Sequence, residues 1–230
     1  MKIRFLLNIL AASLSASVFC APLTWAKASS SDQTLTVIGY HEITNKQNAL
    51  IPEYAVSSAQ FEKHIEWLKK NGYHFISVDQ LLQAHAGKAR LPVKPVLLTV
   101  DDGYESFYQN AYPIIKANKI PAVLAVVGSW LEPAENQKIN FSDEIIPRNA
   151  MLSWEQLKEM QNSGLVEIAS HSYNLHRGIL GNPQGNSEPA AVTRLYDPKT
   201  ASYEDDLHYQ QRITEDLRHN NQLLKAHGIQ

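Results

Sequence analysis

A short apolar run that ends in two carboxylates is the feature that most constrains the fold of this chain. Residues 96–100 read Val-Leu-Leu-Thr-Val, and apolar residues at four of these five positions predict a buried strand. Asp101, Asp102 and Gly103 follow directly. Adjacent carboxylates in a partly buried place repel each other, so a strand end needs a reason to carry them. A metal ion bound by one carboxylate, with the other acting as a base, is one reason. An ordinary turn, where Asp and Gly are common, is the alternative.

A second strand-like segment, residues 166–169, runs into two histidines. His171 and His176 are five positions apart, which does not match the three- or four-residue spacing of one helix face. The spacing fits a strand end followed by a turn, with both imidazoles directed toward one point. A single histidine would more often be an ordinary packed or exposed residue. Two of them, together with the paired carboxylates, predict a site of two histidines and one carboxylate with open positions for water and substrate.

These two segments resemble the motifs of a known family. Residues 99–103 (Thr-Val-Asp-Asp-Gly) resemble the T-F-D-D-G motif of the polysaccharide deacetylases, the NodB-like group of carbohydrate esterases (family 4). Residues 170–176 resemble the second motif, with four residues between the histidines where the common form has three. This spacing, with the flanking residues 101–108 and 127–130, is similar to the biofilm branch that contains the poly-β-1,6-N-acetylglucosamine N-deacetylases. The resemblance covers about residues 35–230.

The resemblance implies a role for each residue of the motifs. Asp102, His171 and His176 would bind a divalent transition metal, and Asp101 would be the general base that takes a proton from water. His41, at the end of the first predicted strand, would be the general acid that protonates the leaving amine. An ordinary strand-end histidine is the alternative for His41. Two histidines and one carboxylate suit Zn²⁺, which we expect here, and also Co²⁺, Ni²⁺ or Fe²⁺.

Three aromatic residues beside the motifs are candidates for substrate binding. Tyr104, Trp130 and Tyr173 could stack on the faces of sugar rings. Aromatic residues near strand ends are more often part of a hydrophobic core, and this alternative stays open.

Strand-like and helix-like segments alternate along the chain, which predicts an α/β fold with a parallel sheet, open or closed. The predicted strands cover residues 35–40, 75–78, 96–100, 122–127 and 166–169, and the predicted helices cover 57–71, 78–86, 108–118, 153–163 and 204–227. Pro113 is expected in the first turns of its helix or at a kink. The resemblance implies a distorted (β/α) barrel with its active residues at the carboxyl ends of strands. Residues 178–206 are rich in Gly and Pro and are predicted to form a long loop that walls a sugar groove or is a surface insertion.

The start of the chain predicts export. Lys2 and Arg4 precede an apolar stretch over residues 5–19, and residues 26–28 (Ala-Lys-Ala) offer a small-x-small cleavage site. Residues 1–28 are therefore predicted to be a secretory signal peptide, because the apolar stretch is too short for a membrane-spanning helix. We expect the product to cross the inner membrane and to act in the periplasm or at the outer membrane.

The remaining residues, 29–230, would form the deacetylase domain. Cys20 is the only cysteine and lies in the predicted signal peptide, where the bulky Phe19 before it disfavours lipid attachment. The end, residues 227–230, reads as a helix stop followed by the start of a strand. We therefore expect the domain to be incomplete at its C-terminus.

The net charge of the chain limits the classes of molecule that it is expected to bind. The formal net charge is −2 and no basic stripe is present, which argues against nucleic acid as a partner. The resemblance implies an N-acetylglucosamine polymer as the partner, together with envelope export machinery. The expected function is metal-dependent removal of N-acetyl groups from poly-β-1,6-N-acetyl-D-glucosamine during biofilm exopolysaccharide export. A peptidoglycan or chitin-type deacetylase and a non-catalytic glycan-binding protein are the alternatives.

Overall fold

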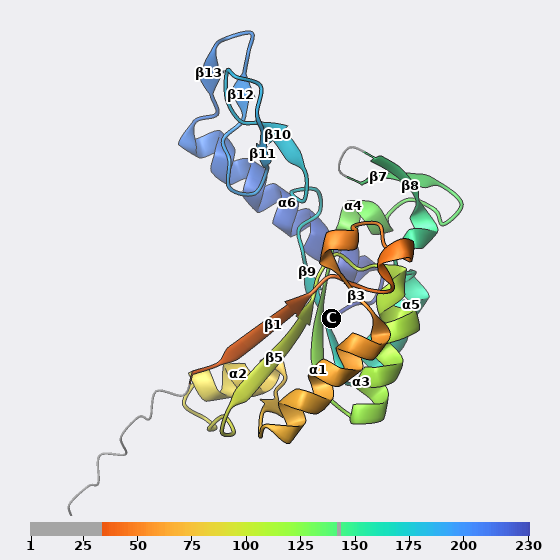
Figure 1. Ribbon diagram of the computed structural model, residues 1–230. Coiled ribbons are helices and arrows are strands. Elements are labelled where there is room, and N and C mark those ends of the chain that lie inside the picture. The colour runs from red at the N-terminus through yellow and green to blue at the C-terminus, as the bar shows by residue number, and fades with distance from the viewer. Residues whose placement is uncertain (1–33, 142–143) are drawn as a thin grey trace, which may run out of the picture. The chain divides into compact units, whose positions relative to one another are not determined.

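The computed structural model describes residues 34–141 and 144–230 (Figure 1). The predicted signal peptide and Cys20 lie outside the described residues, so both remain predictions. Among the described residues, none of the helices combines the length and the hydropathy that a membrane-spanning segment needs.

The centre of the fold is a five-stranded parallel sheet. Its strands are β1 (Thr36–Tyr40), β5 (Pro95–Val100), β6 (Ala122–Val126) and β9 (Val166–Ser170), side by side in that order, with β4 (His74–Phe75) paired to the first residues of β5. Five of the six residues of β5 are buried, as expected for a strand covered on both faces.

The sheet is open within the described residues. Its order begins at β1 and ends at β9, and no described strand joins these two edges. The predicted α/β fold with a parallel sheet is confirmed, whereas the predicted closure into a distorted barrel is not. Closing the sheet would require further strands between β9 and β1, because both of these strands pair on one side only.

Helices follow most strands of the sheet. They are α1 (Ser58–Lys70), α2 (Val78–His85), α3 (Tyr112–Asn118), α4 (Gly128–Leu131), α5 (Trp154–Asn162) and α6 (Asp206–Ala226), with short 3₁₀ turns η1 (Lys46–Asn48), η2 (Pro52–Tyr54) and η4 (Arg148–Ala150). Helices α1, α2 and α5 begin with a Ser-x-x-Gln capping box, in which serine and glutamine each satisfy a free backbone N–H group of the first turn. These reciprocal bonds fix where each helix starts and hence how it approaches the sheet.

The helix predicted over residues 108–118 begins with a π-helical turn, η3 (Phe107–Ala111). The N–H group of Tyr112 donates to the carbonyl of Phe107, five residues back. Pro113 follows as the second residue of α3, directly after this π-helical turn. The prediction that Pro113 lies in the first turns is therefore confirmed.

The two faces of the sheet bury separate sets of apolar side chains, because successive strand residues point to opposite faces. On one face Leu98 and Val100 join the main core with Phe61 and Ile65 of α1. On the other face a smaller cluster contains Ile76, Leu97 and Val123, and the first turns of α2 pack against it. The sheet is thus a buried layer whose strand ends are free to carry polar groups.

Within residues 34–141 and 144–230, four small sheets lie outside this layer. They are the parallel pair β2 (Glu42–Ile43) and β3 (Ala55–Val56), and the antiparallel pairs β7 (Lys138–Phe141) with β8 (Glu144–Pro147), β10 (Gly178–Leu180) with β11 (Ser187–Pro189), and β12 (Tyr196–Asp197) with β13 (Ser202–Tyr203). The last two pairs occupy the segment that was predicted to be a loop, so that prediction is wrong in part. Strands of two or three residues separated by Gly and Pro are too short to produce an alternating pattern.

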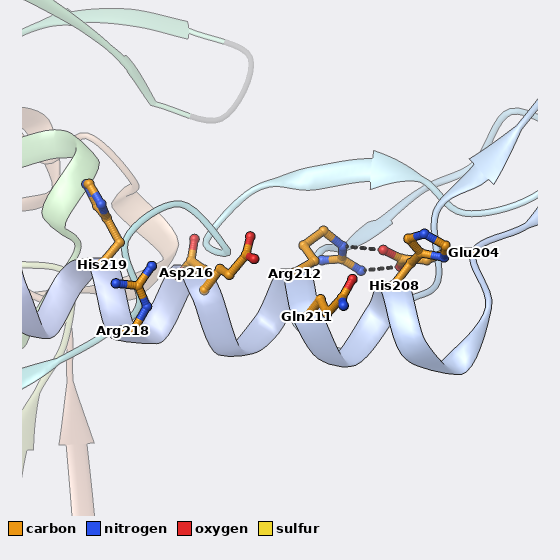
Figure 2. Close-up of a pocket in the computed structure, with 8 residues that line it drawn as sticks. Glu204, His208, Gln211, Arg212, Asp216, Arg218 and His219 are labelled. Atoms are coloured by element: carbon orange, nitrogen blue, oxygen red, sulfur yellow. Dashed lines mark hydrogen bonds and ion pairs between the residues drawn. The ribbon is translucent and has the colours of Figure 1, made fainter.

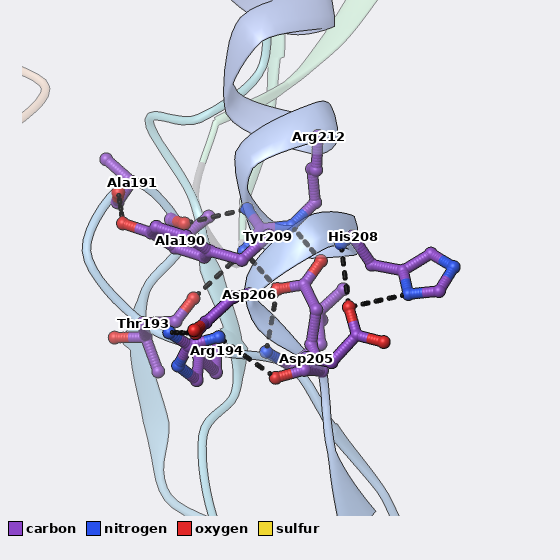
Figure 3. A network of polar contacts seen from close by, with 11 residues as sticks. Ala190, Ala191, Thr193, Arg194, Asp205, Asp206, His208, Tyr209 and Arg212 are labelled. Carbon is purple, nitrogen blue, oxygen red and sulfur yellow. Dashed lines mark hydrogen bonds and ion pairs between the residues drawn. The ribbon is translucent and has the colours of Figure 1, made fainter.

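These two hairpins pack on the first half of α6 (Figure 1). Leu175, Ile179 and Ala190 form a small buried cluster. Leu195 packs against it, and so does Ile213 of α6. A polar network reinforces the contact (Figure 3). The guanidinium of Arg212 donates to both carboxylate oxygens of Glu204, at 2.9 and 2.8 Å, and to the carbonyls of Ala190 and Thr193 at 2.8 and 2.9 Å.

Stability at low pH is expected to depend on the pair of Glu204 and Arg212. The hydrogen bond from Arg212 lowers the pKa of Glu204 from its usual value of 4.5. A carboxyl group whose pKa is lower in the folded state contributes stability above its unfolded pKa, and this contribution is lost as the pH falls through the folded pKa. Replacing Glu204 with glutamine should cost about 1–2 kcal/mol at neutral pH and should flatten the acid dependence below about pH 4.5.

Amide hydrogen exchange in residues 178–206, followed across this pH range, measures the effect. Glu215→Gln is the control, because Glu215 is an exposed carboxylate of the same helix. Equal pH dependence in Glu204→Gln and in the unmodified chain would contradict the prediction.

Candidate metal centre

The carboxyl ends of β5, β6 and β9 meet at one edge of the sheet. Val100 pairs with Leu124, and Val126 two residues later pairs with Ser170. Because the strands are parallel, the residues after β5 and those after β9 emerge at the same edge, on either side of β6. The two motifs, about seventy residues apart in sequence, are therefore brought together there, as strand–helix alternation predicts.

Asp102, His171 and His176 converge at this edge. The Oδ1 atom of Asp102 lies 3.5 Å from Nε2 of His171 and 3.4 Å from Nε2 of His176. Single ligand atoms from the three side chains all lie within 4.8 Å of one another. The Asp102 side chain is only 2% exposed, whereas the imidazoles are 35% and 39% exposed. The cluster is therefore anchored on a buried carboxylate and opens toward solvent on the side of the histidines.

The cluster fits a divalent transition metal. Oδ1 of Asp102 is buried and has no hydrogen-bond partner among the described residues. An ionised carboxylate oxygen without a partner is costly to bury, and a bound cation would compensate it. One carboxylate and two imidazoles leave room for further ligands, which is typical of catalytic rather than structural sites.

A tight turn in left-handed backbone conformation carries Asp102. Its φ angle is 77°, followed by 87° at Gly103, and Ser172 beside His171 has a φ of 72°. Residues other than glycine rarely adopt these angles, and such strain is concentrated at functional sites. Space favours glycine at position 103 as well, because a Cβ atom there would lie 3.0 Å from Cγ1 of Val126, which would have to shift.

Asp101 and His41 lie at the ends of neighbouring strands. The N–H group of Asp101 donates to the carbonyl of Tyr40 at 2.9 Å, which extends the pairing of β1 and β5 by one residue. His41 follows Tyr40 directly, and its ring stacks on Tyr54 with centroids 5.3 Å apart. The structure thus puts both residues at the edge that carries the metal cluster, while their roles as base and acid stay predictions.

The loop that holds Tyr54 is tied down by a buried carboxylate. Oε2 of Glu42 accepts hydrogen bonds from the N–H groups of Leu50 and Ile51, at 2.8 and 3.3 Å. Burial raises the pKa of Glu42. Since Glu42 is adjacent to His41, these bonds also fix the backbone on the far side of the histidine.

The three aromatic candidates occupy different environments. Tyr104 and Trp130 belong to the main core, with 2% and 4% of their surface exposed. Burial raises the pKa of the Tyr104 hydroxyl, and the charge of Asp102 adds to this effect. Trp130 meets the ring of His176 edge-on, with centroids 5.1 Å apart, and so restricts that imidazole. Contact of these two residues with substrate stays a prediction, and their burial leaves little surface for it.

Tyr173 is directed toward α4 and α6. Its hydroxyl donates to a carboxylate oxygen of Glu132 at 2.5 Å, which raises the pKa of Tyr173 to about 12. Its ring packs edge-on against His219 of α6, with centroids 4.2 Å apart. Its predicted contact with substrate also stays a prediction.

A polar pocket adjoins the metal cluster. It has a volume of about 440 Å³, and His176 and Trp130 form part of its wall. The other lining side chains include Asn140 of β7, Asn174 and Arg177. These amide and guanidinium groups can donate hydrogen bonds to sugar hydroxyls and carbonyls. The pocket also contacts the hairpin of β10 and β11, part of the segment for which a sugar-groove wall and a surface insertion are the two predictions.

Two residues of α6 contact the segment that carries His171 and His176, and the sequence alone did not indicate this contact. Asp216 accepts hydrogen bonds from the backbone between the two histidines, and Asn220 donates to Ser170 at the end of β9. Asp216 lies 43 and 42 residues beyond its two partners, Tyr173 and Asn174. A polar residue on a polar helix gives no indication of a contact over such a distance. Only the four-residue spacing of Asp216 and Asn220, which places them on one helix face, was visible.

Comparison with known proteins identifies the family of the chain. The model of the family described as polysaccharide deacetylase matches residues 88–230. The poly-β-1,6-N-acetyl-D-glucosamine N-deacetylase of Escherichia coli K12 is 41% identical over 172 residues, which are 75% of this chain and 26% of that protein. The enzyme of the same name from Staphylococcus aureus MSSA476 is 34% identical over 126 residues, 55% of this chain and 40% of that protein. The chain therefore spans about a quarter to two fifths of the length of these curated relatives.

Solved structures show the same fold. A de-N-acetylase from Aggregatibacter actinomycetemcomitans matches with a TM-score of 0.78 and 38% identity over 84% of this chain and 74% of that one. The BpsB deacetylase domain from Bordetella bronchiseptica matches with a TM-score of 0.74 and 39% identity over 85% and 76% of the two chains. IcaB from Ammonifex degensii matches with a TM-score of 0.63 and 28% identity over 85% and 70%.

Proposed function

Because this chain belongs to the polysaccharide deacetylase family, we propose that it removes N-acetyl groups from poly-β-1,6-N-acetyl-D-glucosamine with the help of a divalent metal ion. The observation that carries the proposal is the convergence of Asp102, His171 and His176 beside a second carboxylate, Asp101. The substrate is taken from relatives that are named for this activity and are 41% and 34% identical.

In this proposal, each residue at the metal-binding edge of the sheet has a distinct role. Asp102, His171 and His176 hold the ion, and Trp130 keeps the ring of His176 in place. A divalent ion held there supplies Lewis acidity, which polarises the acetyl carbonyl and makes a neighbouring water easier to deprotonate. The carboxylate of Asp101 accepts the proton of the attacking water. The imidazole of His41 donates a proton to the amine nitrogen as the C–N bond breaks.

The pocket beside His176 supports a polymeric substrate. When an acetyl group is bound at the metal cluster, the sugar ring that carries it must be held nearby. The same is true of the neighbouring sugar units of the polymer. Asn140, Asn174 and Arg177 provide hydrogen-bond donors on that side. We infer that sugar units of the polymer occupy this pocket.

We propose Zn²⁺ as the metal, with Co²⁺, Ni²⁺ and Fe²⁺ as alternatives. The donor set of two imidazole nitrogens and one carboxylate oxygen supports all four, since nitrogen and oxygen ligands suit each of them. We also propose that residues 1–28 direct export across the inner membrane, so that the enzyme meets the polymer, and the export machinery, in the periplasm or at the outer membrane. The sequence of those residues alone supports this location.

The test is acetate release from β-1,6-linked N-acetylglucosamine oligomers by the purified chain. Release should stop when a chelator removes the metal and return when Zn²⁺, Co²⁺ or Ni²⁺ is added back. β-1,4-linked chitin oligomers and peptidoglycan serve as controls. Faster acetate release from either of them than from the β-1,6-linked oligomers would favour a peptidoglycan or chitin-type deacetylase. Metal binding and glycan binding without acetate release from any polymer would identify a non-catalytic glycan-binding protein and contradict the proposal.

A further inference from the structure

The turn between His171 and His176 is held by hydrogen bonds from two different helices. On one side, the N–H groups at the start of α4 donate to its carbonyls. The N–H group of Gly128 lies 3.1 Å from the carbonyl of Ser172, and that of Ser129 lies 2.9 Å from the carbonyl of Tyr173. The same helix carries Trp130, which contacts the ring of His176.

On the other side, a single carboxylate of α6 accepts the N–H groups of the turn. Oδ1 of Asp216 lies 2.7 Å from the N–H nitrogen of Tyr173, and Oδ2 lies 2.8 Å from that of Asn174. Figure 2 shows Asp216 on α6 between Arg212 and His219. Two consecutive N–H groups each meet one oxygen of a carboxylate, an arrangement that a neutral amide cannot reproduce because one of its two terminal atoms is a donor.

One helical turn later, Asn220 supports the same segment from the strand side. Its Nδ2 atom donates to Oγ of Ser170 at 2.7 Å and to the carbonyl of Val126 at 3.3 Å. Asn220 is fully buried, and its Oδ1 atom would lie 2.0 Å from a Cβ atom placed on Gly128. Helix α6 is thus packed closely against the start of α4, which holds Asp216 at a fixed distance from the turn.

We propose that Asp216 is a positioning residue of the metal centre, which fixes the backbone between His171 and His176 so that both imidazoles are already oriented for the ion. The proposal rests on the assignment of these histidines as metal ligands in the proposed function. Asp216 is outside the cluster of ligand atoms and acts only through the turn. Without it, the N–H groups of Tyr173 and Asn174 would turn to water, and the turn would sample further conformations. Metal binding would then have to order the turn, which costs affinity.

Metal affinity in the unmodified chain, Asp216→Ala and Asp216→Asn tests the proposal directly. Competition with a chromophoric chelator gives the dissociation constant for Zn²⁺. We expect Asp216→Ala to weaken binding by about 10–100-fold, the usual effect of removing a group that orients a ligand, and Asp216→Asn to weaken it less. Glu215→Ala is the matched control, because it removes the same charge one position away from an exposed side chain. Its affinity should equal that of the unmodified chain.

Amide hydrogen exchange in the presence of a chelator gives a second readout that does not involve metal. The amides of Tyr173 and Asn174 should lose protection in Asp216→Ala, while those of β5 and β6 keep it. A general loss of protection in Asp216→Ala would mean that the variant is not folded, and Asp216→Asn then decides the question.

Equal Zn²⁺ affinity in the unmodified chain and in a folded Asp216 variant would overturn the proposal, as would failure of the unmodified chain to bind Zn²⁺, Co²⁺ or Ni²⁺. If the unmodified chain binds metal but releases no acetate, the proposed function fails. The ratio of the Zn²⁺ affinities of the unmodified chain and the Asp216 variants still decides the role of Asp216.

Discussion

Replacing Asp101 with asparagine is expected to lower the turnover number for acetate release by about 10²–10⁴-fold, the range that general base catalysis contributes. The amide of asparagine has the same shape but cannot accept a proton from water. The backbone bond between Asp101 and Tyr40 does not involve the side chain, so the strand end should keep its conformation. Asp102, His171 and His176 are unchanged, and the dissociation constant for Zn²⁺ should therefore stay at the value of the unmodified chain.

Steady-state kinetics on β-1,6-linked oligomers and chelator competition measure the two quantities separately. A fall in turnover with unchanged metal affinity is the signature of a lost base, whereas a fall in both would make Asp101 a ligand. Glu62→Gln, an exposed site on α1, is the control for loss of a carboxylate in general. Full activity in Asp101→Asn would assign the base to another residue.

Replacing Asp102 with asparagine is expected to have opposite effects on metal binding and on stability. Loss of the only carboxylate in the cluster should weaken Zn²⁺ binding by at least about 100-fold, since a ligand contributes at least as much as the groups that orient it. The metal-free protein should instead become more stable, by about 1–3 kcal/mol. The reason is that Oδ1 of Asp102 is a buried carboxylate oxygen with no hydrogen-bond partner in the part of the chain that the structure describes, so asparagine removes a desolvated charge. The site is thus expected to trade stability for function.

Urea denaturation with and without Zn²⁺ checks both effects. The ion should stabilise the unmodified chain, because it binds the folded state, and should leave Asp102→Asn unchanged. Asp79→Asn on α2 is a control on an exposed carboxylate outside the site. A less stable metal-free Asp102→Asn would mean that the two imidazoles already compensate the charge of Asp102 before any metal binds.

The parts of the fold that depend on local sequence could be predicted. The capping box of Ser153 and Gln156 places the start of α5, and the apolar run before Asp101 places the end of β5. The metal cluster could be predicted for the same reason. Asp102 and His171 lie within two residues of a strand end, and His176 lies in the turn that follows. Parallel strands bring their carboxyl ends together without any further information.

Features that depend on distant contacts could not be predicted. The hairpins of residues 178–206 exist because Leu175, Ile179 and Ala190 pack on α6 and because Arg212 binds Glu204, and neither contact leaves a periodic pattern in the short strands. The open sheet was missed because the expectation of a barrel came from the resemblance and not from any feature of residues 34–230 that requires closure. The contact of Asp216 with the turn between His171 and His176 could not be predicted either, since no sequence pattern near Asp216 or near the turn indicates that the two are in contact.

The distance of Asp216 from the turn also sets the order in which the site can form. The hydrogen bonds that Asn220 donates to Val126 and that Tyr173 donates to Asp216 span 94 and 43 residues, respectively. During synthesis from the N-terminus, both histidines emerge from the ribosome well before α6 does. Strands β1 to β9 can therefore pair before the histidine turn is rigid, and tight metal uptake is expected to wait for the docking of α6.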